Sequence, residues 1–139
     1  MPSFSPPTTV LNAKASTGIG TTFPCKDYKN IVVAVSAPLN ASLTYKFQGS
    51  IGSGLATDAA PTFSTAQSVT NHWDYIAFTD MQTAGTLVAG DTGVTIDNDT
   101  AANNTHLYMI NTEGLSWLNM EVTAYTDGSV SAFVVGFTY

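Results

Sequence analysis

The side chains of this sequence that could do chemistry are few, and their spacing matches no catalytic or metal-binding pattern closely. Asp91, Asp97 and Asp99 stand near several asparagines, and loop oxygens of this kind can bind Ca²⁺. The stretch lacks the glycine and the distal glutamate of an EF-hand loop. We therefore predict that these carboxylates are solvated turn residues.

The two histidines and the single cysteine also match no catalytic or metal-binding pattern. His72 and His106 each stand beside a predicted strand, without a His or Cys partner at metal-ligand spacing. Cys25 has no second cysteine to pair with, and a lone cysteine beside Phe23 is typical of a small packed residue. The sequence therefore predicts no catalytic residue, no metal site and no cofactor, and we do not expect an enzyme.

Composition and charge restrict the possible partners. The chain has 139 residues, with four lysines, no arginine and a formal net charge of −6. Arginine is the preferred side chain for contacts with phosphates and bases, so nucleic acid and anionic membrane surfaces are not expected partners. Only 10% of the residues are charged. This suits a surface that neighbouring proteins cover, because charged residues are depleted at interface cores.

The N-terminus does not resemble a targeting segment. Residues 1–7 contain neither a basic stretch nor an apolar one, whereas a signal peptide needs both. No run in the chain approaches the ~20 apolar residues of a spanning helix. We therefore expect a soluble protein that is made in a cytoplasm.

The pattern of the whole chain predicts one all-β domain, an antiparallel sandwich or jelly roll. Threonine and aromatic residues favour strands, and helix-supporting residues are scarce. The continuously apolar run over 31–35 indicates a strand that is buried on both faces or lies at the centre of a sheet. Strands are expected at 27–36, 41–51, 72–78, 86–89, 93–96, 106–111 and 115–139, with a long loop over 49–70 and a hairpin turn at 90–93.

The C-terminal segment over 117–139 is predicted to form a β-hairpin. Asp127 and Gly128 would supply the two residues of a type I′ turn. A two-residue turn fixes the register, and it places three apolar pairs on the core-facing side. These pairs are Val122 with Phe133, Met120 with Val135 and Leu118 with Phe137.

Residues 1–26 are predicted to be an extended N-terminal arm, outside a β-sandwich domain of residues 27–139. Prolines and the Gly18-Ile19-Gly20 stretch interrupt the segment, and only residues 8–12 could form a short edge strand. The arm carries too much apolar surface for a solvated tail, which favours docking against a partner. Its candidate contact residues are Phe4, Val10, Leu11, Ile19 and Phe23.

Aromatic side chains in the domain are the other candidates for a binding surface. Aromatic residues are enriched in interface cores, and they can also form a platform on which sugars stack. Packing within the sandwich is the third possibility. The candidates are Trp73, Trp117, Tyr125 and Tyr139.

Three stretches share a pattern with a known group of proteins: Tyr45–Ile51, Trp73–Asp80 and, with the most specific match, Gly114–Val130. Together they resemble the small β-sandwich virion modules of tailed bacteriophages, over about residues 30–139. The chain departs from those modules at the long 52–72 loop, which stands where they have a short turn, and at Asn119, which stands where they have an arginine. The resemblance implies a non-catalytic protein that decorates heads, tails or fibres.

From this resemblance we expect a capsid decoration (cement) protein that binds between capsomers and stabilises the head, with the arm as a strap. The expected partners are the major capsid protein or other virion proteins, and further copies of the chain in a homotrimer. The expected location is the virion. Two alternatives stay open: a tail, neck or head-fibre component, and a carbohydrate-binding module that uses Trp73 and Trp117.

Overall fold

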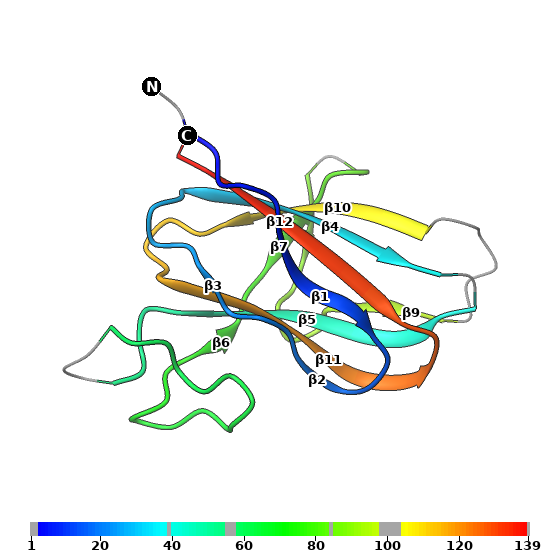
Figure 1. Cartoon of the computed structure of the whole chain (residues 1–139), viewed down its shortest axis with the longest axis horizontal. Helices are drawn as coiled ribbons and strands as arrows, with labels where there is room; N and C mark the ends of the chain where they lie inside the picture. Colours follow the sequence, from blue (N-terminus) through cyan, green and yellow to red (C-terminus); the bar gives the residue numbers. More distant parts are fainter. Residues whose placement is uncertain (1–2, 39, 55–57, 84, 98–103, 139) are drawn as a thin grey trace.

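The protein is a sandwich of two antiparallel sheets, as seen in a computed structural model that describes residues 3–38, 40–54, 58–83, 85–97 and 104–138. The all-β prediction is confirmed (Figure 1). The strands are β1 (Thr8–Lys14), β2 (Gly18–Ile19), β3 (Phe23–Pro24), β4 (Asn30–Ala37), β5 (Ser42–Ser50), β6 (Asp74–Tyr75), β7 (Phe78–Asp80), β8 (Thr86–Val88), β9 (Val94–Ile96), β10 (Asn104–Asn111), β11 (Trp117–Asp127) and β12 (Val130–Phe137).

Each sheet is organised around its long strands. Sheet A has the order β1-β12-β4-β10-β7-β8, and sheet B has the order β2-β11-β5-β6, with β3 also paired to β11 and β9 to β5. Residues alternate between the two faces of a strand, and in β4 the burial alternates strictly between buried and half-buried. The buried positions of both sheets form one core between the layers.

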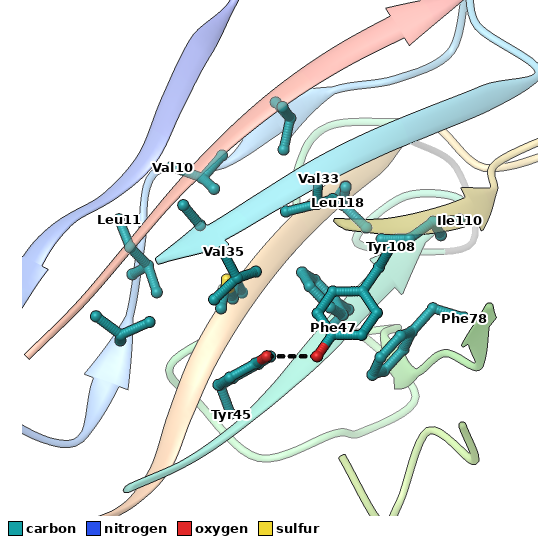
Figure 2. Close-up of a cluster of buried hydrophobic side chains, with 14 of the residues drawn as sticks. Val10, Leu11, Val33, Val35, Tyr45, Phe47, Phe78, Tyr108, Ile110 and Leu118 are labelled. Carbon is teal, nitrogen blue, oxygen red and sulfur yellow. Dashed lines mark hydrogen bonds between the residues drawn. The ribbon is translucent and has the colours of Figure 1, made fainter. Parts of the chain in front are cut away.

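An aromatic cluster joins the two sheets at the centre of the core (Figure 2). Tyr45 and Phe47 come from β5 of sheet B, and Phe78 and Tyr108 come from sheet A. The Phe47 and Phe78 rings meet edge to face with centroids 4.8 Å apart, and the Phe78 and Tyr108 centroids are 5.0 Å apart. The hydroxyls of Tyr45 and Tyr108 hydrogen-bond to each other at 2.9 Å, so neither buried hydroxyl is left without a partner. Burial raises the pKa of both tyrosines.

The predicted C-terminal hairpin is wrong, because β11 and β12 lie in opposite sheets. β11 pairs with β5, whereas β12 pairs with β4 and β1. Asp127 and Gly128 do reverse the chain, and Gly128 has a φ of +81°. The turn, however, carries the chain across the end of the sandwich, where a Cβ on Gly128 would lie 2.6 Å from the Cα of Ala41.

This crossing inverts the expected faces of β12. Val130, Ala132 and Val134 point into the core and are fully buried, so the outward residues are the ones predicted to face inward: Phe133, Val135 and Phe137. In β11 the predicted inward residues are confirmed, since Leu118, Met120 and Val122 are all buried.

The same kind of crossing occurs at other turns. The turn over 90–93 joins β8 of sheet A to β9 of sheet B, so it does not form the predicted hairpin. The single strand predicted over 72–78 is divided into β6 in sheet B and β7 in sheet A. Among the strands of the described residues, the only consecutive ones that pair directly are β5 with β6 and β7 with β8.

The segment predicted as an N-terminal arm contributes three strands to the sandwich. β1 pairs with β12, and β2 and β3 both pair with β11. Val10, Leu11 and Phe23 are buried in the core, so the apolar content of this segment completes the protein's own sheets. The structure therefore places residues 8–24 inside the domain, with no boundary at residue 26. The ends of the described chain also meet, since the Ser3 amide donates to Thr138 Oγ1 at 2.9 Å.

Cys25 is fully buried after β3, and it should make stability depend on pH. Burial raises the pKa of its thiol from 9.0 to about 12. Because the folded-state pKa is the higher one, this contribution to stability is complete below about pH 9 and is lost as the pH rises towards 12. We compare the free energies of unfolding of the natural protein and of Cys25→Ala. The difference between them should fall by about 1.4 kcal/mol per pH unit in this range.

Urea unfolding of both proteins at several pH values measures this difference. The tyrosines are common to the two proteins, so their ionisation cancels in the subtraction. A difference that stays constant up to about pH 11 would show that the thiol ionises equally in the folded and unfolded chains.

Candidate functional site

The outward side of sheet A is an apolar surface, which we call the A face. Directly opposite residues of antiparallel strands share a face, and the strand registers align the outward residues in rows. One row is Thr9, Phe133, Ala34 and Leu107. The next row is Val135, Val32, Met109, Thr79 and Leu87. Leu107 and Phe133 are each 44% exposed and Leu87 is 68% exposed, so these rows present apolar side chains to the outside.

None of the paired outward residues that the structure describes on the A face is charged. The polar residues among them are small or neutral: Thr9, Asn30, Ser36, Thr79, Thr105, Asn111 and Ser131. The hydroxyls of Ser36 and Thr105 lie on neighbouring strands and hydrogen-bond to each other at 2.9 Å. Such a surface loses little solvation when a partner covers it.

The sequence carries a signal for this surface in its continuous apolar runs. A strand with one wet face alternates apolar and polar residues, whereas a strand covered on both faces reads as an unbroken apolar run. β4 has such a run over 31–35, β10 over 107–110 and β12 over 132–135. Sheet B covers the inner side of these strands, and the outer side of the runs forms the A face.

The outward side of sheet B has the opposite character. Glu121 of β11 lies directly opposite Lys46 of β5. The Tyr75 hydroxyl donates to Glu121 Oε1 at 2.6 Å, and Lys46 Nζ lies 4.7 Å from the centroid of the Tyr75 ring. Partial burial and this contact with Glu121 raise the pKa of Tyr75. Charged and hydrogen-bonded side chains therefore occupy this face.

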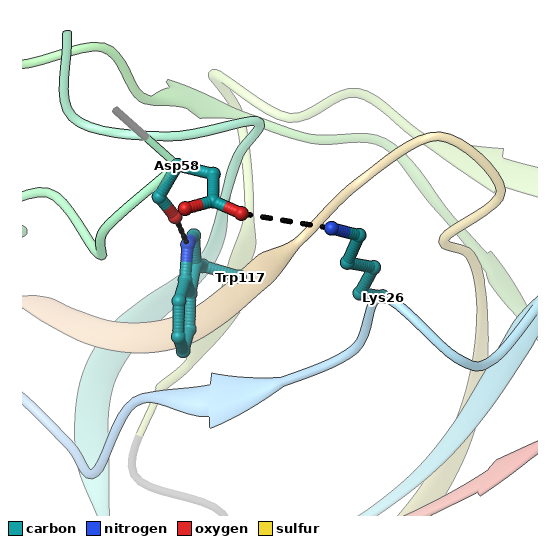
Figure 3. A network of polar contacts seen from close by, with 3 residues as sticks. All are labelled: Lys26, Asp58 and Trp117. Carbon is teal, nitrogen blue, oxygen red and sulfur yellow. Dashed lines mark hydrogen bonds and ion pairs between the residues drawn. The ribbon is translucent and has the colours of Figure 1, made fainter. Parts of the chain in front are cut away.

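The two tryptophans hold the long loop that follows β5. The Trp73 indole N–H donates to the Thr65 carbonyl at 2.9 Å, and the Trp117 indole N–H donates to the Asp58 carbonyl at 2.7 Å (Figure 3). The Asp58 carboxylate also lies 3.6 Å from Lys26 Nζ, in an exposed ion pair. Both indole N–H groups are thus used by the protein's own backbone, and both tryptophans are half-buried.

Trp117→Phe should loosen this loop while leaving the sandwich folded. The change keeps an aromatic ring and removes one hydrogen bond, which is worth about 0.5–1.5 kcal/mol. We expect faster limited proteolysis within residues 58–73 and little change in the global unfolding transition. Lys26→Ala is the matched control, because it removes only the exposed ion pair, whose contribution is typically about 0–1 kcal/mol. Equal cleavage rates in the natural protein and Trp117→Phe would contradict the proposed anchoring.

A pocket of about 440 Å³ lies where this loop meets the end of the sandwich. Its apolar wall includes Trp73, Ile76 and Leu115. Two polar side chains on its rim are engaged with the loop itself: Gln67 donates to the Trp73 carbonyl at 2.7 Å, and Asn71 donates to the Thr62 carbonyl at 3.0 Å. The loop therefore holds both of these side chains in place at the rim.

The candidate contact residues from the sequence are dispersed over the fold. Phe4 is 60% exposed and packs edge to face on Phe137 at the border of the A face. Ile19 is half-buried on β2, and the half-buried Tyr125 donates to the Gly128 carbonyl at 2.8 Å. Tyr139 lies outside the described residues, as does Asp99. The residues that sequence reasoning missed are Leu87, Leu107 and, because of the inverted register, Phe133.

Within the described ranges, no three His, Cys, Asp or Glu side chains gather closely enough to hold a metal ion. The same part of the chain has no helix that is long and apolar enough to cross a membrane.

The fold is similar to that of a solved structure, the crystal structure of the SPBc2 prophage-derived protein YomS. The TM-score is 0.66 at 17% sequence identity, and the match covers 99% of this chain and 96% of that chain. No family model matches the sequence, and no curated protein matches it. The whole chain therefore shares its fold with a prophage-derived protein.

Proposed function

We propose that this chain is a structural protein of a tailed-bacteriophage particle and that it acts by binding neighbouring proteins, without catalysis. The observation that carries the proposal is the likeness of fold to a prophage-derived protein over almost the full length of both chains. It agrees with the resemblance of Gly114–Val130 to virion modules, which comes from the sequence alone.

The A face supports an assembly role. Covering apolar surface contributes about 25 cal/mol per Å², and the charge-free rows of the A face provide such surface on a rigid sheet. Within the particle, the finer role that we propose is capsid decoration: each bound copy stabilises the shell by mass action, because it binds the assembled state. A tail, neck or head-fibre position is the alternative, and it would use the same surface.

The strap mechanism expected from the sequence needs revision. Val10, Leu11 and Phe23 are in the core, so they cannot reach a capsomer while the domain is folded. The proposal therefore assigns the contact with neighbouring proteins to the A face, with Phe4 at its border as a contributor.

Particle composition tests the proposal. Phage particles purified from a strain that carries the gene with an epitope tag should contain the protein in fixed stoichiometry, and antibody labelling in electron micrographs should mark the head. Labelling of the tail or neck would select the alternative position. A protein found only among the unassembled soluble proteins of the lysate would refute the virion role.

A further inference from the structure

We infer that the A face is a self-association surface, on which a second copy of this chain packs face to face about a twofold axis. The inference deepens the proposed function, on which it rests: it names a second copy as the neighbouring protein that covers the A face, so contacts with other virion proteins would use the surfaces outside that face. Its test nevertheless needs only the purified chain. Charge, area and symmetry each favour a second copy as the occupant.

Charge favours a partner surface that is also uncharged. The chain carries a net charge of −6, yet the paired outward residues described on the A face include no charge. A partner that placed Lys or Glu side chains against this surface would bury them without an opposite charge, which is costly. A second copy presents an uncharged surface and keeps the acidic side chains of both molecules outside the contact.

The size of the surface suits a modest dimer interface. The three central strands β12, β4 and β10 have eight residues each. At about 3.4 Å per residue and about 4.8 Å between strands, these three strands cover about 27 Å by 14 Å, and the seven residues of β1 and the three each of β7 and β8 extend the surface. This gives on the order of 600 Å² per partner, and two such faces reach about 1,200 Å², the lower end of specific stable interfaces.

Symmetry favours a dimer over the trimer expected from the sequence. A surface that binds its own copy forms an isologous contact, which closes after two subunits, whereas a trimer needs two different complementary patches. Two sheets that pack face to face lie about 10 Å apart, so Phe133 and Leu107 of each copy would fill the layer between them. The resulting dimer would have the layers B-A-A-B, with both sides of each sheet A covered.

Sedimentation velocity of the full-length chain over a range of concentrations tests the inference. The natural protein should show a concentration-dependent shift from the 14.6 kDa monomer to twice that mass. Phe133→Lys combined with Leu107→Lys places like charges in the contact and should raise the dissociation constant at least about 100-fold. Val69→Lys is the matched control, because Val69 is 78% exposed on the long loop away from the A face, and its dissociation constant should not change.

Circular dichroism and thermal unfolding check that the double variant is folded, and Phe133→Thr, which keeps strand propensity, replaces it if it is not. A natural protein that stays monomeric at every concentration would overturn the inference, as would a trimer or a dimer that survives both substitutions. A monomeric protein that is still found in purified particles would leave the proposed function standing. A dimer that is absent from particles would support the inference and refute the proposed function.

Discussion

Phe47→Ala should lower the free energy of unfolding by about 3–5 kcal/mol, the cost typical of emptying a core aromatic site. Phe47 is 1% exposed and belongs to the aromatic cluster between the sheets. The centroid of its ring lies 4.8 Å from that of Phe78 and 6.3 Å from that of Tyr108, both of sheet A. Its removal would leave a cavity between the sheets where contacts from both layers meet. Urea unfolding measures the loss.

Phe133→Ala is the matched control, since it makes the same chemical change on a strand of the other sheet. Phe133 points outward and is 44% exposed, so its truncation should cost about 1 kcal/mol or less. Both variants should be measured at two protein concentrations, because self-association makes apparent stability depend on concentration. If Phe133→Ala proved as damaging as Phe47→Ala, the hairpin register predicted from the sequence would be correct and the observed face of β12 would not.

Gly128→Ala should lower the free energy of unfolding by about 2–5 kcal/mol, from two separate causes. A side chain at a φ of +81° costs about 1–2 kcal/mol. The new Cβ would also lie 2.6 Å from the Cα of Ala41, a backbone atom that cannot rotate away, and overpacking of this kind typically adds about 1–3 kcal/mol.

Gly114→Ala separates the two contributions. Gly114 has a φ of +90°, and a Cβ there would meet no atom within 4 Å, so only the backbone cost of about 1–2 kcal/mol applies. Thermal and urea unfolding of the two variants should therefore show a clearly larger loss for Gly128→Ala. Equal losses would mean that Gly128 occupies an open hairpin turn and does not cross over Ala41.

The strands were predictable from the sequence because their signals are local. The alternation in β5 and the apolar run in β4 depend only on neighbouring residues, and they predicted an all-β sandwich correctly. The inward positions of β11 were also predictable, since Leu118, Met120 and Val122 are every second residue of a strand with polar residues between them.

Strand pairing was not predictable, because a turn sequence specifies a reversal of the chain and not the sheet in which the chain continues. Asp127-Gly128 and the turn over 90–93 both have hairpin composition, yet both connect opposite sheets. The difference lies in distant contacts, such as the approach of Gly128 to Ala41. For the same reason the strand character of residues 18–24 was missed: β2 and β3 have two residues each and exist through their pairing with β11.

The candidate site followed from the sequence only in part. The low charge of the chain predicted a covered surface, but the residues chosen for it came mostly from the N-terminal segment and the tryptophans. Placing Phe133 and Leu107 in one row, on either side of Ala34, requires the register of three strands, β12, β4 and β10. That register joins residues far apart in the chain.

The meeting of Ser3 with Thr138 has a practical consequence for protein engineering. The Ser3 amide donates to Thr138 Oγ1 at 2.9 Å, and the Thr138 amide donates to the Ser3 carbonyl at 3.1 Å, so both ends leave the molecule at one corner (Figure 1). Domains whose ends are adjacent tolerate insertion and circular permutation. This domain could therefore be grafted into a surface loop of an unrelated host protein, or relinked head to tail and reopened within the 58–73 loop, without separating β1 from β12.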